Sequence, residues 1–156
     1  MDQINVACEY EVLPGNIHYF KWRQADQTAI EEFASNYEKA LTAETSRDQM
    51  LILLDFRLLD RQPSIARLFG HLRQMFNRIH QRPASIRAAY LFYQEWGLVT
   101  IVKTFLGLLR LNANRRFYHD ARPDDDSVLH NALAWLREDH AEDDSTPTHM
   151  KKIKRD

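Results

Sequence analysis

A short apolar run, Met50–Phe56, carries a single charge, Asp55, and is followed by polar residues. The run is shorter than a typical helix and its residues are apolar without alternation, so it predicts a strand that is buried on both faces. Such strands occur in sheets that helices cover on both sides. The run therefore predicts an α/β fold.

The segments on either side of this run alternate between strand and helix patterns. Apolar residues at every second position predict strands, and apolar residues three and four positions apart predict helices. A turn at Pro14–Asn16 predicts a hairpin, because glycine and asparagine tolerate a positive φ. The predicted elements are strands 4–13 and 17–22, a helix to Leu41 begun by Asp26 or Thr28, strand 50–56, helix 64–79, strand 85–93, helix 96–111, edge strand 115–119 and a last helix begun by Asp126 or Ser127.

This ββαβαβαβα order predicts a mixed, mostly parallel five-stranded sheet with an N-terminal hairpin and about four helices. Residues 1–138 are long enough to form one domain with its own core. Residues 139–156 have no apolar period, so we expect them to form a flexible charged tail.

Composition and charge exclude several classes of function. With 21 basic and 22 acidic side chains, the formal net charge is -1, so nucleic acid is not an expected partner. The single cysteine, Cys8, cannot form an internal disulfide. The sequence shows neither a signal peptide nor a transmembrane segment. We therefore expect a soluble, cytoplasmic protein.

Asp55 and Asp60 flank the carboxyl end of the buried strand, where α/β sheets usually bind ligands. A catalytic or metal site there needs a second convergent carboxylate and a positioned lysine or hydroxyl. The segment Asp55–Arg57 lacks this set, so we expect Asp55 to pair with a neighbouring arginine or to end the strand. An enzyme built around Asp55 is an alternative interpretation.

Other patterns typical of cofactor sites are also missing from the sequence. The seven histidines show no metal-binding spacing, and the four glycines never cluster into a phosphate-binding loop. We predict no catalytic residue, metal or cofactor.

Helix 96–111 is apolar around much of its circumference. Three interpretations remain open: burial in the core, contact with a partner protein or a second copy of the chain, and binding of an apolar or acyl molecule between the sheet and this helix. The candidate interaction-surface residues are Asp55, Arg57, Asp60 and Arg61 after the buried strand, and Trp96, Lys103 and Arg110 in the helix.

Three sequence features resemble the STAS domain family: the strand ending Leu53–Asp55, the opening Tyr10–Asn16 and the closing Ala132–Arg137. The element order fits as well, over roughly residues 6–138. The chain is most similar to short stand-alone bacterial proteins related to anti-sigma-factor antagonists. The resemblance implies a STAS-like sandwich and a non-enzymatic regulatory module that binds a partner protein.

The family is often controlled by phosphorylation of a serine where the helix after the third strand begins. The family's segment has an aspartate, a serine and a second serine before a glycine, whereas Ser64 is the only hydroxyl residue within Asp55–Ile65. A serine at this position is ordinarily a helix cap. A phosphate there would meet the positive end of the helix dipole, near Arg61 and Arg67. Ser64 is therefore the switch candidate.

Overall fold

The computed structural model describes residues 5–44, 48–80, 83–93, 113–119 and 122–138. Within them, five strands form one sheet in the spatial order β1-β2-β3-β4-β5. β1 pairs with β2 in antiparallel fashion, and all other neighbours are parallel. The elements are β1 Cys8–Leu13, β2 Ile17–Trp22, α1 Gln27–Ala43, β3 Gln49–Asp55, α2 Ile65–Arg78, β4 Ser85–Leu91, β5 Ala113–Tyr118 and α4 Asp126–Arg137.

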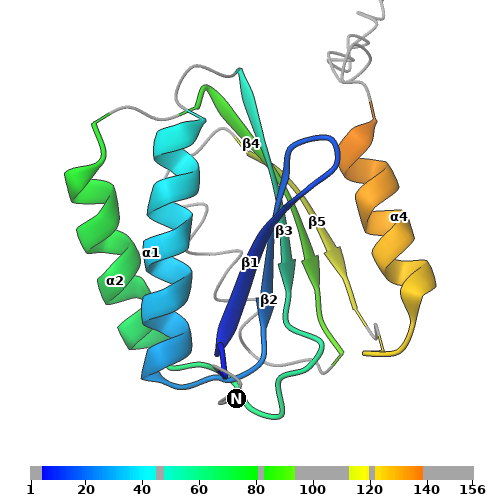
Figure 1. Ribbon diagram of the computed structural model, residues 1–156, viewed down its shortest axis with the longest axis horizontal. Coiled ribbons are helices and arrows are strands. Elements are labelled where there is room, and N and C mark those ends of the chain that lie inside the picture. Colours follow the sequence, from blue (N-terminus) through cyan, green and yellow to red (C-terminus); the bar gives the residue numbers. More distant parts are fainter. Residues whose placement is uncertain (1–4, 45–47, 81–82, 94–112, 120–121, 139–156) are drawn as a thin grey trace, which may run out of the picture.

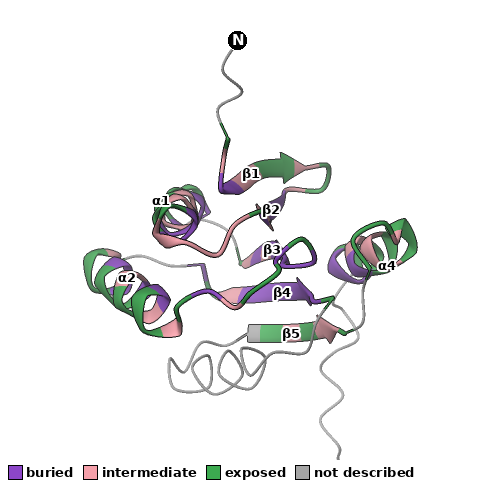
Figure 2. Cartoon of the chain, turned by 90° about the horizontal axis from the view of Figure 1, so that it is seen from below, coloured by how far each residue is buried: buried purple, intermediate pink, exposed green. Residues whose placement is uncertain are grey.

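The apolar run forms a buried strand, β3, as predicted, and β3 is the central strand of the sheet. Helices α1 and α2 lie side by side on one face, and α4 lies on the other (Figure 1). Because side chains alternate along a strand, Ile52 and Leu54 pack toward α1 and α2, whereas Leu53 packs toward α4. Burial is concentrated in the inner strands β2, β3 and β4 and on the inner sides of the helices, whereas β1 and β5 are more exposed (Figure 2). The α/β class is confirmed, and the third predicted helix, 96–111, lies outside the described residues.

The predicted hairpin is present, and its turn contains Gly15 and Asn16 at φ values of 89° and 60°. These left-handed conformations favour glycine and asparagine. The first strand begins at Cys8, later than predicted. Before it, the carbonyl oxygen of Ala7 accepts hydrogen bonds from the amides of Arg23 and Gln24, beyond the end of the β1–β2 ladder.

Two helix caps were predicted with different success. Asp26 caps α1, because its carboxylate accepts a hydrogen bond from the amide of Ala29 at 3.0 Å. At α4 the predicted caps were wrong by one residue or more: Asp125 is the cap and accepts from the amide of Ser127 at 3.0 Å. In a run of three aspartates, residue type alone does not decide which one has the extended backbone of a cap.

Candidate functional site

Asp55, at the carboxyl end of β3, is buried in a closed network of hydrogen bonds. The Tyr19 hydroxyl donates to Asp55 Oδ2 at 2.8 Å. The Arg57 side chain binds both carboxylate oxygens, with Nε to Oδ1 at 2.9 Å and Nη2 to Oδ2 at 2.8 Å, and the Arg57 amide donates to Oδ1 at 3.1 Å. The Asp55–Arg57 pair is thus bidentate, the strongest geometry for such a contact.

The same arginine reaches the segment before α4. Its Nη1 donates to the carbonyl oxygens of Asp125 at 3.2 Å and Arg122 at 3.4 Å. The hydrogen bond to Asp55 raises the pKa of Arg57, and burial together with the charge of Asp55 raises the pKa of Tyr19 above its ordinary value. This network therefore joins β2, β3 and the segment before α4.

The expected pairing of Asp55 with a neighbouring arginine is present. Asp55 and Arg57 were also predicted to be interaction-surface residues. This prediction is wrong, because their side chains are only 1% and 5% exposed and bind each other. Carboxylate and guanidinium groups are buried together when each satisfies the other.

A second buried arginine, Arg87 of β4, was missed by the sequence analysis. Its guanidinium lies 3.9 Å from the centre of the Trp135 ring. It also donates to the carbonyl oxygen of Trp135 in the last turn of α4, and its Nη2 lies 3.6 Å from Glu138 Oε2. A cation at this end of a helix is favoured by the dipole. No sequence signal distinguished Arg87 from a solvent-exposed arginine.

A third polar cluster lies on the α1 side of the sheet, at the start of β2. The Tyr10 hydroxyl lies 2.8 Å from His18 Nδ1, and His18 Nε2 lies 3.1 Å from Glu44 Oε1. Asn16 of the hairpin turn donates to the same oxygen at 2.7 Å. His18 and Glu44 are both buried. The cluster fastens the hairpin to the end of α1.

The segment between β3 and α2 exposes several of the predicted surface residues. Asp60 and Arg61 are exposed, and so is the apolar side chain of Leu58. Ser64 is the N-cap residue of α2, with an extended backbone, but its side chain makes no capping hydrogen bond. The ordinary capping role expected for this serine is therefore absent, and its exposed hydroxyl is left for solvent.

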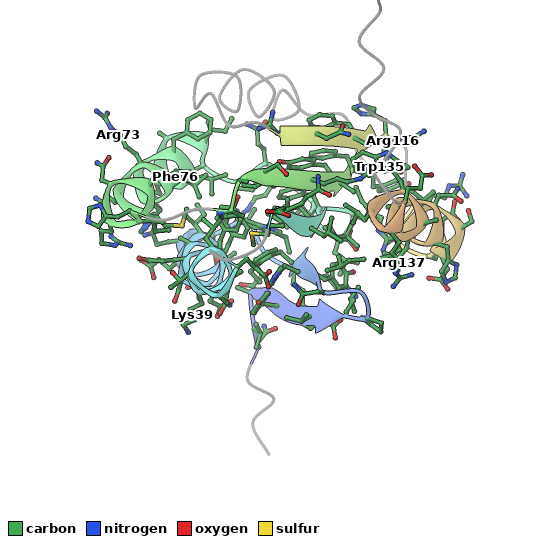
Figure 3. The ribbon with its side chains drawn as sticks, turned by 90° about the horizontal axis from the view of Figure 1, so that it is seen from above. Lys39, Arg73, Phe76, Arg116, Trp135 and Arg137 are labelled. Carbon is green, nitrogen blue, oxygen red and sulfur yellow. The ribbon has the colours of Figure 1, made fainter. Side chains whose placement is uncertain are left out.

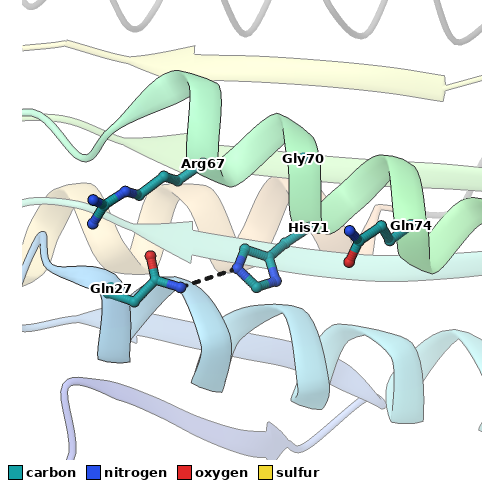
Figure 4. A pocket seen from close by; sticks show the side chains of 5 residues that line it. All are labelled: Gln27, Arg67, Gly70, His71 and Gln74. Carbon is teal, nitrogen blue, oxygen red and sulfur yellow. Dashed lines mark hydrogen bonds between the residues drawn. The ribbon is translucent and has the colours of Figure 1, made fainter.

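Helix α2 has a basic outer surface. It contains Arg67, Arg73 and Arg78 and no aspartate or glutamate. Arg73 points away from the sheet (Figure 3). Beside α1, the residues that line a groove of about 480 Å³ are Gln27 of α1 and Arg67, Gly70, His71 and Gln74 of α2 (Figure 4).

Three predicted surface residues, Trp96, Lys103 and Arg110, lie outside the described residues. Cys8 is buried in β1, and desolvation followed by the charges of Glu32 and Glu9 raises the pKa of its thiol. This thiol is therefore protonated at neutral pH. In the ranges that the structure describes, there is no cluster of metal-binding side chains and no helix suited to crossing a membrane.

No protein-family model matches this sequence, and no curated protein matches it. A solved structure does match: an uncharacterised protein of the DUF3478 family from Shewanella loihica PV-4, described as having a SpoIIAA-like fold. The two chains are 18% identical, and the match covers 83% of this chain and 92% of the other, with a TM-score of 0.51. The chain therefore has a SpoIIAA-like, that is STAS-like, fold, as the sequence resemblance predicted.

Proposed function

We propose that this protein is a non-enzymatic regulatory module that acts by binding a partner protein. The observation that carries the proposal is the contrast between closed buried networks and an open charged surface after β3. That surface comprises Leu58, Asp60, Arg61 and Ser64, and we call it the β3–α2 surface. The SpoIIAA-like fold is compatible with such a role.

The buried charged groups favour a structural role over catalysis. Asp55 is occupied by Arg57 and Tyr19, and Arg87 is engaged with α4. A catalytic site needs titratable groups that converge on a cleft where substrate can enter. In the described part of the chain, the buried side chains Asp55, Arg57 and Arg87 are instead bound to other groups of the protein in the interior.

The β3–α2 surface has the composition of a binding surface. Leu58 is 40% exposed and lies in the same segment as the charged side chains of Asp60 and Arg61. An exposed apolar side chain with charged neighbours suits a small protein interface, in which apolar contact supplies affinity and charge supplies orientation. We infer that a partner contacts this segment. The partner can be another protein or a second copy of this chain, and the experiment below distinguishes the two.

Site-specific photocrosslinking in the native host tests the proposal. A photoreactive residue is placed at Asp60, and the matched control carries it at Val12, an exposed residue of β1. We expect one specific adduct from position 60, weakened by Arg61→Glu and absent from position 12. An adduct of twice the chain's mass identifies a homodimer. Equal adducts from both positions, or none from position 60, contradict the proposal.

Regulation is proposed to act through Ser64. The serine is exposed, begins α2 and makes no capping hydrogen bond, so a phosphate on its oxygen would lie at the free amide groups of the helix and near Arg61. We expect Ser64→Asp to change the yield of the position-60 adduct, while Ser64→Ala leaves it unchanged. Equal yields from the two variants would exclude the switch.

A second candidate function is the binding of an apolar or acyl molecule. The observation that favours it is an aromatic row along one face of β4 and β5, where Tyr90 and Phe117 stack at 4.8 Å and Phe92 lies 6.4 Å from Phe117. This row lies on the sheet face opposite α4. Mass spectrometry of an organic extract from protein purified without detergent tests it. If the extract contains no apolar compound in an amount proportional to the protein, this candidate function is contradicted.

A further inference from the structure

β1 borders the sheet, and part of its outer edge is unpaired within the described residues (Figure 2). The carbonyl oxygen of Ala7 accepts hydrogen bonds from the chain just after β2, and the backbone groups of an edge strand point inward and outward in turn. The amides of Cys8, Tyr10 and Val12 therefore point away from β2. Cys8 donates to Glu32 Oε2 of α1 at 2.7 Å, whereas no described residue accepts from Tyr10 or Val12. An open edge of this kind is a template for another strand.

The side chains along this edge differ between the two faces of the sheet. Tyr10 packs on the α1/α2 face, and Leu13 packs on the α4 face. Because side chains alternate, Glu9 and Glu11 lie on the α4 face, while Val12 lies on the α1/α2 face and is 53% exposed. A hollow of about 190 Å³ at this edge is lined by Glu9, Tyr10 and Glu11 of β1 and by Tyr19 and Lys21 of β2. A strand placed here meets carboxylates on one face and apolar side chains on the other.

The carboxylates at this edge are only partly neutralised by neighbouring cations. Glu9 pairs with Arg23 at 2.5 Å and lies opposite Lys21 of β2. By contrast, neither Glu11 nor Glu32 forms an ion pair with a residue that the structure describes. A second copy of β1 is unsuited to the edge, because it would bring its own glutamates to the same face, and like charges on paired strands are destabilising. The charges therefore favour a basic strand.

Segment 150–155 of the chain has the complementary pattern, although it lies outside the described residues. Its sequence is Met-Lys-Lys-Ile-Lys-Arg. In an extended strand, Lys152 and Lys154 fall on one face and Ile153 falls on the other. The order basic, apolar, basic thus matches the order acidic, apolar, acidic of Glu9–Glu11.

Helix α4 brings the chain to the end of β1 from which such a strand can start. Arg137, in the last turn of α4, donates to the carbonyl oxygen of Pro14 in the hairpin turn at 3.1 Å (Figure 1). A strand that starts there and runs along β1 is antiparallel to it. Residues 139–149 can span roughly 35 Å when extended, and β1 is about 20 Å long. A segment tethered this closely has an effective concentration on the order of millimolar, which favours it over a separate chain.

We propose that segment 150–155 of this chain adds to the outer edge of β1 as an antiparallel strand, with Ile153 opposite Tyr10. In this register Lys152 lies opposite Glu11, and the open backbone groups of β1 gain hydrogen-bond partners. The added strand covers the edge against pairing with other chains. This inference goes beyond the proposed function, because it concerns a border of the sheet and not the β3–α2 surface.

The same register aligns the remaining charges of the segment. Lys154 lies opposite Glu9 on the α4 face. Arg155 lies opposite Cys8 on the α1/α2 face, which is the side from which Glu32 reaches the Cys8 amide. Both faces of the added strand therefore bring opposite charges together, as cross-strand pairs prefer.

Amide hydrogen exchange, resolved by residue with NMR, tests the pairing in the full chain. We expect protected amides at Tyr10 and Val12. Ile153→Pro should speed their exchange by at least about fivefold, because proline cannot donate to the β1 ladder. The matched control Ala141→Pro lies in the connecting stretch and should leave exchange unchanged. Equal exchange in the original chain and in Ile153→Pro would overturn the inference.

A charge exchange tests the register. Lys152→Glu should lower the protection of Tyr10, and adding Glu11→Lys should restore it, because the pair is then reversed instead of lost. The matched control Lys151→Glu makes the same charge change on the other face, so Glu11→Lys should not rescue it. No rescue of Lys152→Glu, or equal rescue of both variants, would contradict the pairing.

Dilution and lipid vesicles distinguish other roles of the basic segment. Protection of Tyr10 that is unchanged on dilution supports pairing within one chain. Protection that disappears on dilution assigns the segment to a second copy and overturns the proposal. Binding of the chain to phosphatidylglycerol vesicles, with no protection at Tyr10 in their absence, assigns the lysines to a membrane surface and also overturns it. None of these outcomes depends on the adduct from position 60.

Discussion

The two faces of the sheet are held to their helices by different means. On the α1/α2 face, a large cluster joins two helices to four strands through aromatic and aliphatic side chains, among them Phe20, Trp22 and Phe76. On the α4 face, a smaller apolar cluster joins one helix to the sheet through Ala132, Trp135 and Leu136. Trp135 and Phe76 mark the two sides in Figure 3.

Buried arginines supplement the smaller cluster. Arg57 donates to carbonyl oxygens before the first turn of α4, and Arg87 donates to the carbonyl of Trp135 in its last turn. Helix α4 is thus fastened at both ends by cations held in the sheet layer. Apolar contact is non-directional, whereas hydrogen bonds to backbone carbonyls specify position. The hydrogen bonds from Arg57 and Arg87 therefore fix the position of α4, whose apolar contact with the sheet is small.

Among the substitutions that test the contrast between the two faces, Arg57→Ala should have the largest effect on stability. The substitution leaves the Asp55 carboxylate buried without its bidentate partner and releases the segment before α4. We expect a loss of about 3–5 kcal/mol in the free energy of unfolding, measured by urea denaturation. In hydrogen exchange, amides of α4 should lose protection before those of α1. Arg116→Ala is the control, and equal loss of protection in both helices would contradict the contrast between the faces.

Arg87→Met should have the next largest effect. Methionine keeps much of the buried volume but removes the hydrogen bond to the Trp135 carbonyl and the contact with its ring. We expect a loss of about 1–3 kcal/mol, again with weaker protection at the last turn of α4. A variant as stable as the original chain would show that apolar packing alone holds this end.

Alkaline pH should lower the free energy of unfolding through ionisation of Tyr90, which lies on the α1/α2 face. Burial raises the pKa of Tyr90 from 10.0 to about 12, so the unfolded chain loses this proton at a lower pH than the folded chain. Stability is therefore constant below pH 10 with respect to this group and falls between pH 10 and about 12. The loss should reach about 2–3 kcal/mol. In Tyr90→Phe, the curve of unfolding free energy against pH should be flatter by this amount.

The smallest expected effect is that of Gly70→Ala, and it has the opposite sign. Because no described neighbour meets the added methyl group, the helix should gain about 0.5–1 kcal/mol. Thermal unfolding measures the shift. A loss of stability instead would reveal a packing constraint at this position.

The sequence predicted most of the fold because its elements carry strong periodic signals. The apolar run Met50–Phe56 placed the central strand, and the spacing of Leu68, Leu72 and Phe76 placed the buried side of α2. Boundaries were less exact: the edge strand predicted over 115–119 is Ala113–Tyr118. Strand ends depend on pairing with a neighbour, and a single segment does not specify that pairing.

The candidate site was predicted only in part. The exposed residues Asp60, Arg61 and Ser64 were identified from their place after a buried strand, whereas the groove at Gly70 and His71 was not. Its two sides come from α1 and α2, and Gln27 is far from His71 in the chain. A groove between helices has no local sequence signal, because it depends on how the two helices pack.

The sequence alone determined the α/β class, the hairpin at Gly15 and the buried character of β3, because each is indicated by a local pattern of apolar or turn residues along the chain. The sequence also placed Arg67 and Arg73 on the outer side of a helix, but only the tertiary structure decided that Arg57 and Arg87 are interior groups that fasten α4. An arginine has the same side chain in either setting. Its surroundings are supplied by distant segments, and they decide whether its charge is paired inside the fold or offered to a partner.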